Sequence, residues 1–140
     1  MTKSLLILSL ALAATGCSKS SSKESPTALE ASNLTFISVD DVDAHLAKGT
    51  AQAVDANGVA TRKHEGVVPG AVLLTDSETY ALTELPTDKT KELVFYCANT
   101  HCGASHQAAE KAIASGYTNV KVMSEGITGW VKAGKKVQNI

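Results

Sequence analysis

The sequence predicts an α/β fold: a single domain with a central, mainly parallel sheet that is flanked by helices. Short apolar segments typical of strands alternate along the chain with amphipathic segments typical of helices. Glycines follow two of the amphipathic segments, at Gly49 and Gly116, where helices commonly end. The 140 residues are enough for one domain with a hydrophobic core. The net charge of −1 shows no basic excess, so we expect no nucleic-acid partner.

The first half of the domain is predicted to hold three strands and one helix. Ser38, with Asp41 three residues later, resembles a capping box, so a helix is expected to begin there. His45 lies off the apolar face of this helix and is expected to face solvent. The loop between the second and third strands starts at Asn57 and ends at Gly70. The expected elements are a strand at 36–37, a helix at 38–48, strands at 51–55 and 71–74, and a weak helical turn at 80–85.

The second half continues the alternation of strands and helices. An apolar run at 93–96 indicates a buried central strand. The helix at 104–115 is expected to bury its small residues Ala104, Ala108, Ala109 and Ala112, together with Ile113, which would bring it close to the sheet. A strand at 120–123 and a short helix at 126–132 complete the domain.

Cys97 is the residue that points most directly to chemistry. It directly follows the apolar run at 93–96, and a helix is expected to begin a few residues later. Ligands bind at the carboxyl ends of parallel strands, and the N–H groups at a helix N-terminus favour negative charge. Such a position favours the thiolate, which makes Cys97 a candidate nucleophile. The alternative is a small buried residue at the end of a strand.

The N-terminal residues resemble an export signal. Lys3 precedes a ten-residue apolar segment at 5–14, which is too short to span a bilayer, and small residues then lead to Cys17. A small-residue cleavage site that ends on a cysteine resembles a bacterial lipobox. It implies that residues 1–16 are removed, that Cys17 is lipidated, and that the protein is anchored to a membrane in the periplasm or cell envelope. The alternative is an ordinary secretory signal.

Residues 17–33 are rich in Ser and Lys and have no apolar periodicity, so we expect a flexible tether before a folded domain at 34–140. Without Cys17, the domain keeps two cysteines, Cys97 and Cys102. Exported proteins occupy an oxidising compartment, where two nearby cysteines could pair.

Four short motifs occur in order along the domain. They are Val54-Asp55, Gly66-Val67-Val68-Pro69-Gly70-Ala71, Phe95-Tyr96-Cys97, and Gly116-Tyr117-Thr118-Asn119-Val120 followed by Gly126-Ile127-Thr128-Gly129-Trp130 and Gly134. Together they resemble the rhodanese domain, over about residues 36–137. The resemblance implies that Cys97 carries a persulfide sulfur, taken from a donor such as thiosulfate and passed to a nucleophilic acceptor. It also implies a loop whose N–H groups surround that sulfur, formed by Ala98, Asn99, Thr100, His101, Cys102 and Gly103.

The Cys97 loop departs from the family pattern in length and in charge. It is two residues longer between Cys97 and Ser105, and it carries no permanent cation, so thiosulfate, a dianion, is expected to be a weak donor. The arginine usually found just after the strand Asp is absent, and Asn57 lies nearby instead. Arg62 is a candidate for anion binding at the mouth of the loop; the alternative is an exposed arginine without that role. A second cysteine five positions after the first fits a variant subgroup of the family.

The residues of this loop bear on three other kinds of chemistry. Cys97 and Cys102 could form a redox or resolving pair, depending on their Cα separation. A Cys-dependent phosphatase needs an arginine that closes the loop on phosphate, and Gly103 stands there, so this function is excluded. The cysteines, His101 and His106 do not follow a standard zinc spacing, and we expect neither a metal nor a cofactor.

The sequence therefore predicts a lipid-anchored rhodanese-like protein that transfers sulfur through a Cys97 persulfide. Its expected partners are a small sulfur donor or thiol acceptor, and a membrane reached through the lipid anchor. Two alternatives stay open: a non-catalytic rhodanese-like binding module, and a thiol redox protein that uses Cys97 and Cys102.

Overall fold

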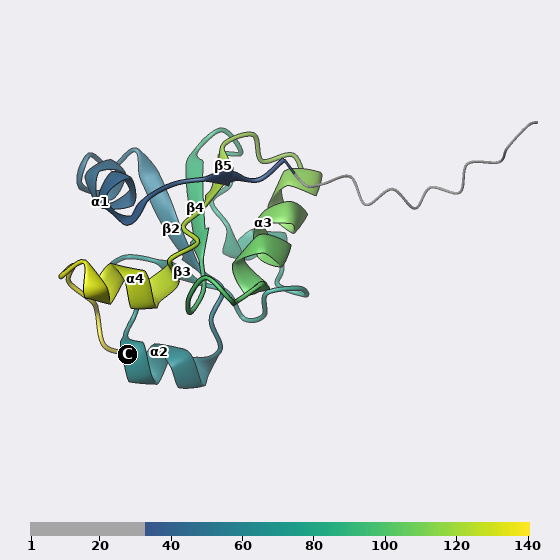
Figure 1. Ribbon diagram of the computed structural model, residues 1–140. Coiled ribbons are helices and arrows are strands. Elements are labelled where there is room, and N and C mark those ends of the chain that lie inside the picture. The colour runs from purple at the N-terminus through teal and green to yellow at the C-terminus, as the bar shows by residue number, and fades with distance from the viewer. Residues whose placement is uncertain (1–32) are drawn as a thin grey trace, which may run out of the picture. The chain divides into compact units, whose positions relative to one another are not determined.

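A central parallel sheet organises the domain (Figure 1). The computed structural model describes residues 33–140; Cys17, the predicted signal peptide and nearly all of the predicted tether lie outside the described residues. The strand order is β1-β5-β4-β2-β3, and every neighbouring pair is parallel, which confirms the predicted fold class. The strands are β1 (Thr35–Phe36), β2 (Ala51–Asp55), β3 (Val72–Leu73), β4 (Glu92–Tyr96) and β5 (Val120–Val122).

Helices cover both faces of the sheet, and each face has its own apolar cluster. Helix α3 packs on one face, and α1 and α4 lie on the other (Figure 1). Residues of β4 alternate between the clusters: Leu93 and Phe95 face α3, while Val94 and Tyr96 face α1 and α4. The helices are α1 (Val39–Ala47), α2 (Val59–Glu65), α3 (Ala104–Ala114) and α4 (Gly126–Lys132), with a 3₁₀ turn η1 at Leu82–Glu84.

Helix α3 packs closely on the sheet through small residues. Its buried positions are Ser105, Ala108, Ala109 and Ala112, so the expected small-residue face is present, although Ala104 is only partly buried. Ile113 is 40% exposed, and the expectation that it is buried is wrong because it lies outside the arc that faces the sheet. The buried Tyr80 hydroxyl donates to the carbonyl of Ala108 at 2.8 Å, and burial raises the pKa of Tyr80 to about 12.

Helix α1 begins as predicted, with the Ser38 hydroxyl accepting a hydrogen bond from the Asp41 N–H at 3.2 Å. His45 is only partly exposed, because its side chain is also paired within the fold, which the sequence did not predict. Its Nδ1 lies 2.6 Å from a carboxylate oxygen of Glu92, and Lys121 Nζ lies 2.7 Å from the other oxygen. Glu92 is only 8% exposed at the start of β4, and a buried carboxylate requires such partners.

Helix α2 was not expected, because the sequence predicted a loop over residues 57–70. The helix has seven residues, and Arg62 is its one buried side chain, whereas Val59 is 60% exposed. A helix whose buried residue is charged has no apolar periodicity, which is the signal that identifies short helices. The helix is instead held by hydrogen bonds from Arg62 to Asp55 and Leu74, which lie outside it.

Candidate functional site

Cys97 lies where the sequence predicted, directly after β4 at the carboxyl edge of the sheet. It is 1% exposed and packs in the apolar cluster on the α3 side. A loop follows it as far as Gly103, and α3 starts at Ala104. The sulfur is therefore held between the central strand and the N-terminal end of an eleven-residue helix, whose dipole favours an anion.

Helix α4 fixes the start of the Cys97 loop from the other side of the sheet. The N–H groups of Ile127 and Thr128 donate to the carbonyls of Cys97 and Ala98, at 2.8 and 3.0 Å. Gly126 has a φ of +63°, and a Cβ on it would lie 2.5 Å from the Cys97 carbonyl oxygen. Only glycine permits this approach, which explains the glycine in the sequence motif that leads to Trp130.

Cys97 is joined to Cys102 by a disulfide, with their Cα atoms 6.3 Å apart. This separation lies within the range that a disulfide spans. The Cys97 sulfur also lies 3.3 Å from the hydroxyl oxygen of Ser105 and 3.1 Å from the carbonyl oxygen of Cys102. The hydroxyl can donate to the sulfur, and the carbonyl can accept from the thiol when the pair is reduced. Cys102 is only partly buried, unlike Cys97.

Asn99 folds the rest of the loop into a compact turn. Its carbonyl accepts from the Cys102 N–H at 3.1 Å, and its side-chain oxygen accepts from the His101 N–H at 3.0 Å. Asn99, Thr100 and His101 are exposed. Within residues 33–140, the N–H groups of Ala98, Thr100, Gly103 and Ala104 have no protein acceptor. The predicted cradle residues therefore do form one loop, and it keeps backbone donors available for an anion.

Arg62 lies inside the fold, so the alternative of an exposed arginine is wrong, and its candidacy for anion binding stays a prediction. Its Nε bonds the Oδ1 of the fully buried Asp55 at 3.0 Å, and its Nη2 bonds the carbonyls of Asp55 and Leu74, both at 2.9 Å. The Asn57 N–H donates to the same Oδ1 at 2.7 Å. The guanidinium reaches Asp55 from seven residues along the chain. Burial and the charge of Asp55 raise the pKa of the neighbouring Tyr96.

A pocket of about 350 Å³ opens beside the Cys97 loop. His64 and Glu65 are paired at 2.9 Å, and Glu65 is the one carboxylate among the lining residues. No lysine or arginine lines the pocket, and Arg62 is not part of it. Sequence reasoning missed the α2 residues here because it predicted no helix. The lining residues are Ala60, Thr61, His64 and Glu65 of α2, Ala98 and Asn99 of the loop, and Thr128 of α4.

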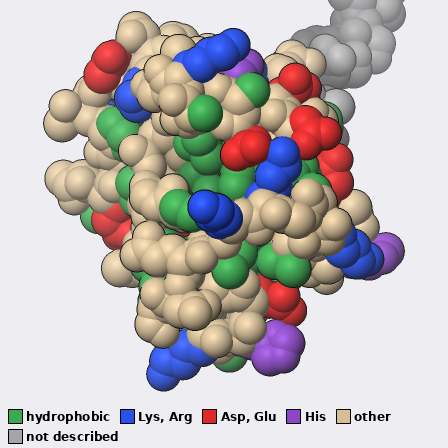
Figure 2. Space-filling model, turned by 90° about the vertical axis from the view of Figure 1, so that its left-hand side faces the viewer, with side chains coloured by type: hydrophobic (Ala, Val, Ile, Leu, Met, Phe, Trp, Pro, Cys, Tyr) green, Lys and Arg blue, Asp and Glu red, His purple; other side chains and the backbone are tan. Residues whose placement is uncertain are grey.

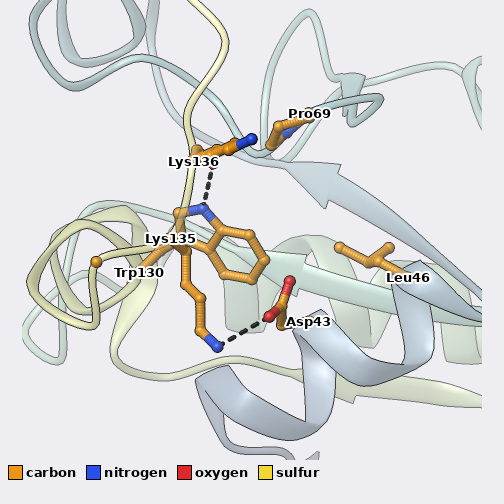
Figure 3. A pocket seen from close by; sticks show the side chains of 7 residues that line it. Asp43, Leu46, Pro69, Trp130, Lys135 and Lys136 are labelled. Carbon is orange, nitrogen blue, oxygen red and sulfur yellow. Dashed lines mark hydrogen bonds and ion pairs between the residues drawn. The ribbon is translucent and has the colours of Figure 1, made fainter.

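A second hollow lies on the face that carries α1 and α4, where hydrophobic side chains gather beside charged ones (Figure 2). Its volume is about 420 Å³. Trp130 donates to the Lys136 carbonyl at 2.7 Å, and Lys135 Nζ lies 2.8 Å from Asp43 (Figure 3). No residue of the Cys97 loop lines this hollow, so it is separate from the candidate site.

The described part of the chain offers neither a metal centre nor a membrane span. Among residues 33–140, no three or more His, Cys, Asp or Glu side chains are grouped so that they could hold a metal ion. Of the helices in the same range, none combines the length and the apolar character needed to cross a bilayer.

Comparison with known proteins identifies the family. Residues 38–133 match the rhodanese-like domain. No match was found among curated proteins. Similar solved structures include the BH2092 protein of Bacillus halodurans, at 24% identity with a TM-score of 0.66, covering 75% of this chain and 77% of that one.

The names of two other similar structures refer to a sulfur-transfer activity. SseA of Escherichia coli, described among 3-mercaptopyruvate sulfotransferases, is 20% identical with a TM-score of 0.62; the match covers 76% of this chain and 51% of that one. The human single-domain sulfurtransferase TSTD1 is 21% identical with a TM-score of 0.55, and the match covers 69% and 95% of the two chains. At these identities the likeness shows the fold, while the family match spans most of the chain. This protein therefore belongs to the rhodanese-like domain family.

Proposed function

We propose that this protein is a sulfurtransferase that carries sulfane sulfur as a persulfide on Cys97. The observation that carries the proposal is the placement of Cys97: a buried sulfur at the carboxyl end of the central strand, beside the Ser105 hydroxyl and the N-terminus of α3. The two relatives described by sulfur transfer support the same activity.

The reaction has two displacements at sulfur. The Cys97 thiolate attacks the sulfane sulfur of a donor, a new S–S bond forms, and the donor's remaining part leaves with the electron pair of the broken bond. With thiosulfate, that leaving group is sulfite. A nucleophilic acceptor then attacks the terminal sulfur of the persulfide, and Cys97 returns as a thiolate. The unpaired loop N–H groups and the α3 dipole stabilise the anion at each stage.

The pocket beside the loop favours donors that carry little negative charge. It offers hydroxyl, amide and imidazole groups from Thr61, Thr128, Asn99 and His64, but no lysine or arginine, and Glu65 adds a negative charge. A dianion such as thiosulfate would gain no charge-assisted bond from a permanent cation there. We therefore propose weak activity toward thiosulfate and better activity toward a sulfane-sulfur donor that carries less negative charge than this dianion.

The disulfide favours a second candidate function, that of a thiol redox protein that cycles between the Cys97–Cys102 disulfide and the dithiol. Cys97 cannot accept sulfur while it is bonded to Cys102. Sulfur transfer therefore requires the reduced pair, whereas a redox protein requires both cysteines. This difference separates the two functions experimentally.

The test measures cyanide-labile sulfur on the reduced full chain after incubation with a sulfane-sulfur donor. A sulfurtransferase gains this sulfur in Cys102→Ser and loses it in Cys97→Ser. A redox protein shows none in either variant, but reduces a disulfide substrate only with both cysteines present. A non-catalytic binding module shows neither activity, and that result would overturn the proposal.

We also propose that the protein is held at a membrane of the cell envelope by a lipid on Cys17. The support is the apolar segment at 5–14 that leads to Thr15-Gly16-Cys17. Mass spectrometry of the mature N-terminus should find a lipid-modified Cys17, and the protein should partition with membranes. Cys17→Ser should lose both properties. An unmodified wild-type protein in the soluble fraction would contradict the anchor.

A further inference from the structure

We infer that Cys102 resolves the Cys97 persulfide, releasing the bound sulfur as hydrosulfide, and that a dithiol reductant then resets the site by attacking Cys102. This inference rests on the proposed function, because it requires a persulfide on Cys97. It adds a product, hydrosulfide, and a partner class, a dithiol, to the reaction.

The geometry of the pair supports the resolving step. The two cysteines are already bonded across a Cα separation of 6.3 Å, with β4 and α3 in place and the turn at Asn99 formed. Cys102 can therefore reach the inner sulfur of a Cys97 persulfide without displacement of the strand or the helix. An external acceptor must instead reach a terminal sulfur that is held on a cysteine only 1% exposed. Attack by Cys102 competes with transfer to any acceptor that arrives slowly.

The resolving step balances in atoms and electrons. The Cys102 thiolate attacks the Cys97 Sγ, and the Cys97–Cys102 bond forms. The bond between Cys97 Sγ and the terminal sulfur breaks, and that sulfur leaves with the electron pair as hydrosulfide. The terminal sulfur is reduced and the two cysteine sulfurs are oxidised, so no outside oxidant is needed.

The two sulfurs of the disulfide differ in access and as leaving groups. Cys97 is buried, whereas Cys102 is partly exposed on the loop between the exposed residues His101 and Gly103. A Cys97 thiolate would also be stabilised by the Ser105 hydroxyl at 3.3 Å and by the α3 dipole, so Cys97 is the better leaving group. Both differences direct an incoming thiolate to Cys102. The mixed disulfide therefore forms on Cys102, and Cys97 leaves as the thiolate.

A dithiol completes the cycle. Its second thiolate attacks its own sulfur in the mixed disulfide, Cys102 leaves as a thiolate, and the dithiol becomes a disulfide. A monothiol has no second thiolate, so it leaves the mixed disulfide on Cys102 until a further thiol arrives. The reaction that consumes the oxidised protein is therefore a dithiol–disulfide exchange.

The first experiment follows sulfide from the reduced full chain given a limiting amount of sulfane-sulfur donor and no acceptor. Wild type should release the donated sulfur as sulfide and gain the Cys97–Cys102 disulfide. Cys102→Ser should keep the sulfur on Cys97, with loss of sulfide release. Ala114→Ser, a serine substitution at an exposed position of α3, serves as the matched control and should behave as wild type.

The outcomes separate this inference from the proposed function. If wild type and Cys102→Ser hold an equally stable persulfide, Cys102 does not resolve it, although sulfur transfer stands. If neither protein takes up sulfur, the proposed function fails and the inference fails with it.

The second experiment locates the mixed disulfide. The oxidised full chain is treated with the monothiol glutathione, free thiols are alkylated, and the peptide that contains both cysteines is fragmented in the mass spectrometer. Glutathione should be found on Cys102 and the alkyl group on Cys97. The reverse distribution would overturn the assignment of Cys102 as the attacked sulfur.

Discussion

The two ends of strand β4 both bury a polar side chain, but they surround it differently. At the amino end, Glu92 is 8% exposed and both its oxygens have nitrogen partners, on His45 and Lys121. At the carboxyl end, Cys97 is 1% exposed, and its sulfur has neutral partners, Ser105 and Cys102. The amino end therefore matches a charge with charged or chargeable groups. In the proposed function, the carboxyl end would stabilise an anion through neutral backbone donors of the loop and the α3 dipole.

Along this one strand, the residue at the amino end therefore contributes to stability, and the residue at the carboxyl end to the proposed chemistry. The carboxylate of Glu92 is fully engaged and is not available to react with a ligand. During the proposed reaction the sulfur of Cys97 changes its bonding partner. Its surroundings must therefore accommodate a thiolate, a persulfide and a disulfide. The backbone around it must then be fixed by other contacts. Those contacts are the hydrogen bonds from α4 to the carbonyls of Cys97 and Ala98, and the close approach of Gly126.

The largest effect on stability is expected from removing the buried charge of Arg62, which pairs with Asp55 at the carboxyl end of β2. Arg62→Met leaves the fully buried Asp55 without its guanidinium partner, and should lower the free energy of unfolding by about 3–5 kcal/mol in urea denaturation. Lys63→Met, at the exposed neighbouring position, should change it by less than about 0.5 kcal/mol. Arg62→Lys keeps the charge but loses the planar fork, and should fall between them. Unchanged stability in Arg62→Met with a raised KM for thiosulfate would instead assign Arg62 to anion binding.

Gly126→Ala should disturb the backbone of the Cys97 loop itself. The added Cβ would meet the Cys97 carbonyl oxygen, and the positive φ adds strain, so we expect a loss of about 2–4 kcal/mol in unfolding free energy and weaker sulfur transfer. Gly134→Ala is the matched control: its φ is +73° but a Cβ there meets nothing, so it should cost about 1 kcal/mol and leave transfer intact. Equal losses in the two variants would show that close approach of α4 is unimportant.

Glu92→Gln should affect stability but not sulfur transfer. Burial raises the pKa of Glu92, but hydrogen bonds from His45 and Lys121 outweigh it, so the pKa lies below its ordinary value of 4.5. Its contribution is therefore present above about pH 4.5 and is lost as the pH falls through the lower folded-state pKa. At neutral pH we expect a loss of about 1–3 kcal/mol in unfolding free energy.

The pH profile distinguishes this role from a general effect of charge. Wild type should lose stability on acidification more steeply than Glu92→Gln, while Glu78→Gln, at an exposed position, should follow wild type. Parallel curves for wild type and Glu92→Gln would contradict the assignment, and so would a loss of sulfur transfer in Glu92→Gln.

The smallest effect is expected from adding a positive charge to the Cys97 loop, which follows the carboxyl end of β4. Thr100→Arg adds a cation to the exposed part of the Cys97 loop without removing the Asn99 hydrogen bonds. An exposed charge pair should raise kcat/KM for thiosulfate by about two- to tenfold. Thr87→Arg, at an exposed position before β4, adds the same charge elsewhere and should leave kcat/KM unchanged. Equal rates in both variants would show that charge does not limit thiosulfate turnover.

The parts of the fold predicted from the sequence are those with local signals. The Ser38 cap marks the start of α1, and the apolar run before Cys97 marks β4. Helix α2 has no such signal, because its buried residue is Arg62 and its stabilising partner, Asp55, lies outside the helix. The pairing of His45 with Glu92 joins residues 47 positions apart, and no local pattern encodes it.

The same limit applies to the candidate site. The position of Cys97 at a strand end, and the loop that follows it, could be predicted from strand and helix patterns. The disulfide could not, because the Cα separation of Cys97 and Cys102 depends on how Asn99 turns the loop. The pocket beside the loop could not be predicted either, since it requires α2.

The most direct test of a Cys97 persulfide is the mass of the peptide that contains Cys97. Reduced Cys102→Ser is used, because it lacks the proposed resolving thiol, and it is measured before and after incubation with a small persulfide donor. Cys97 should gain the mass of one sulfur atom and lose it again on addition of cyanide. A peptide of unchanged mass, or added sulfur located on a residue other than Cys97, would contradict sulfur transfer through Cys97.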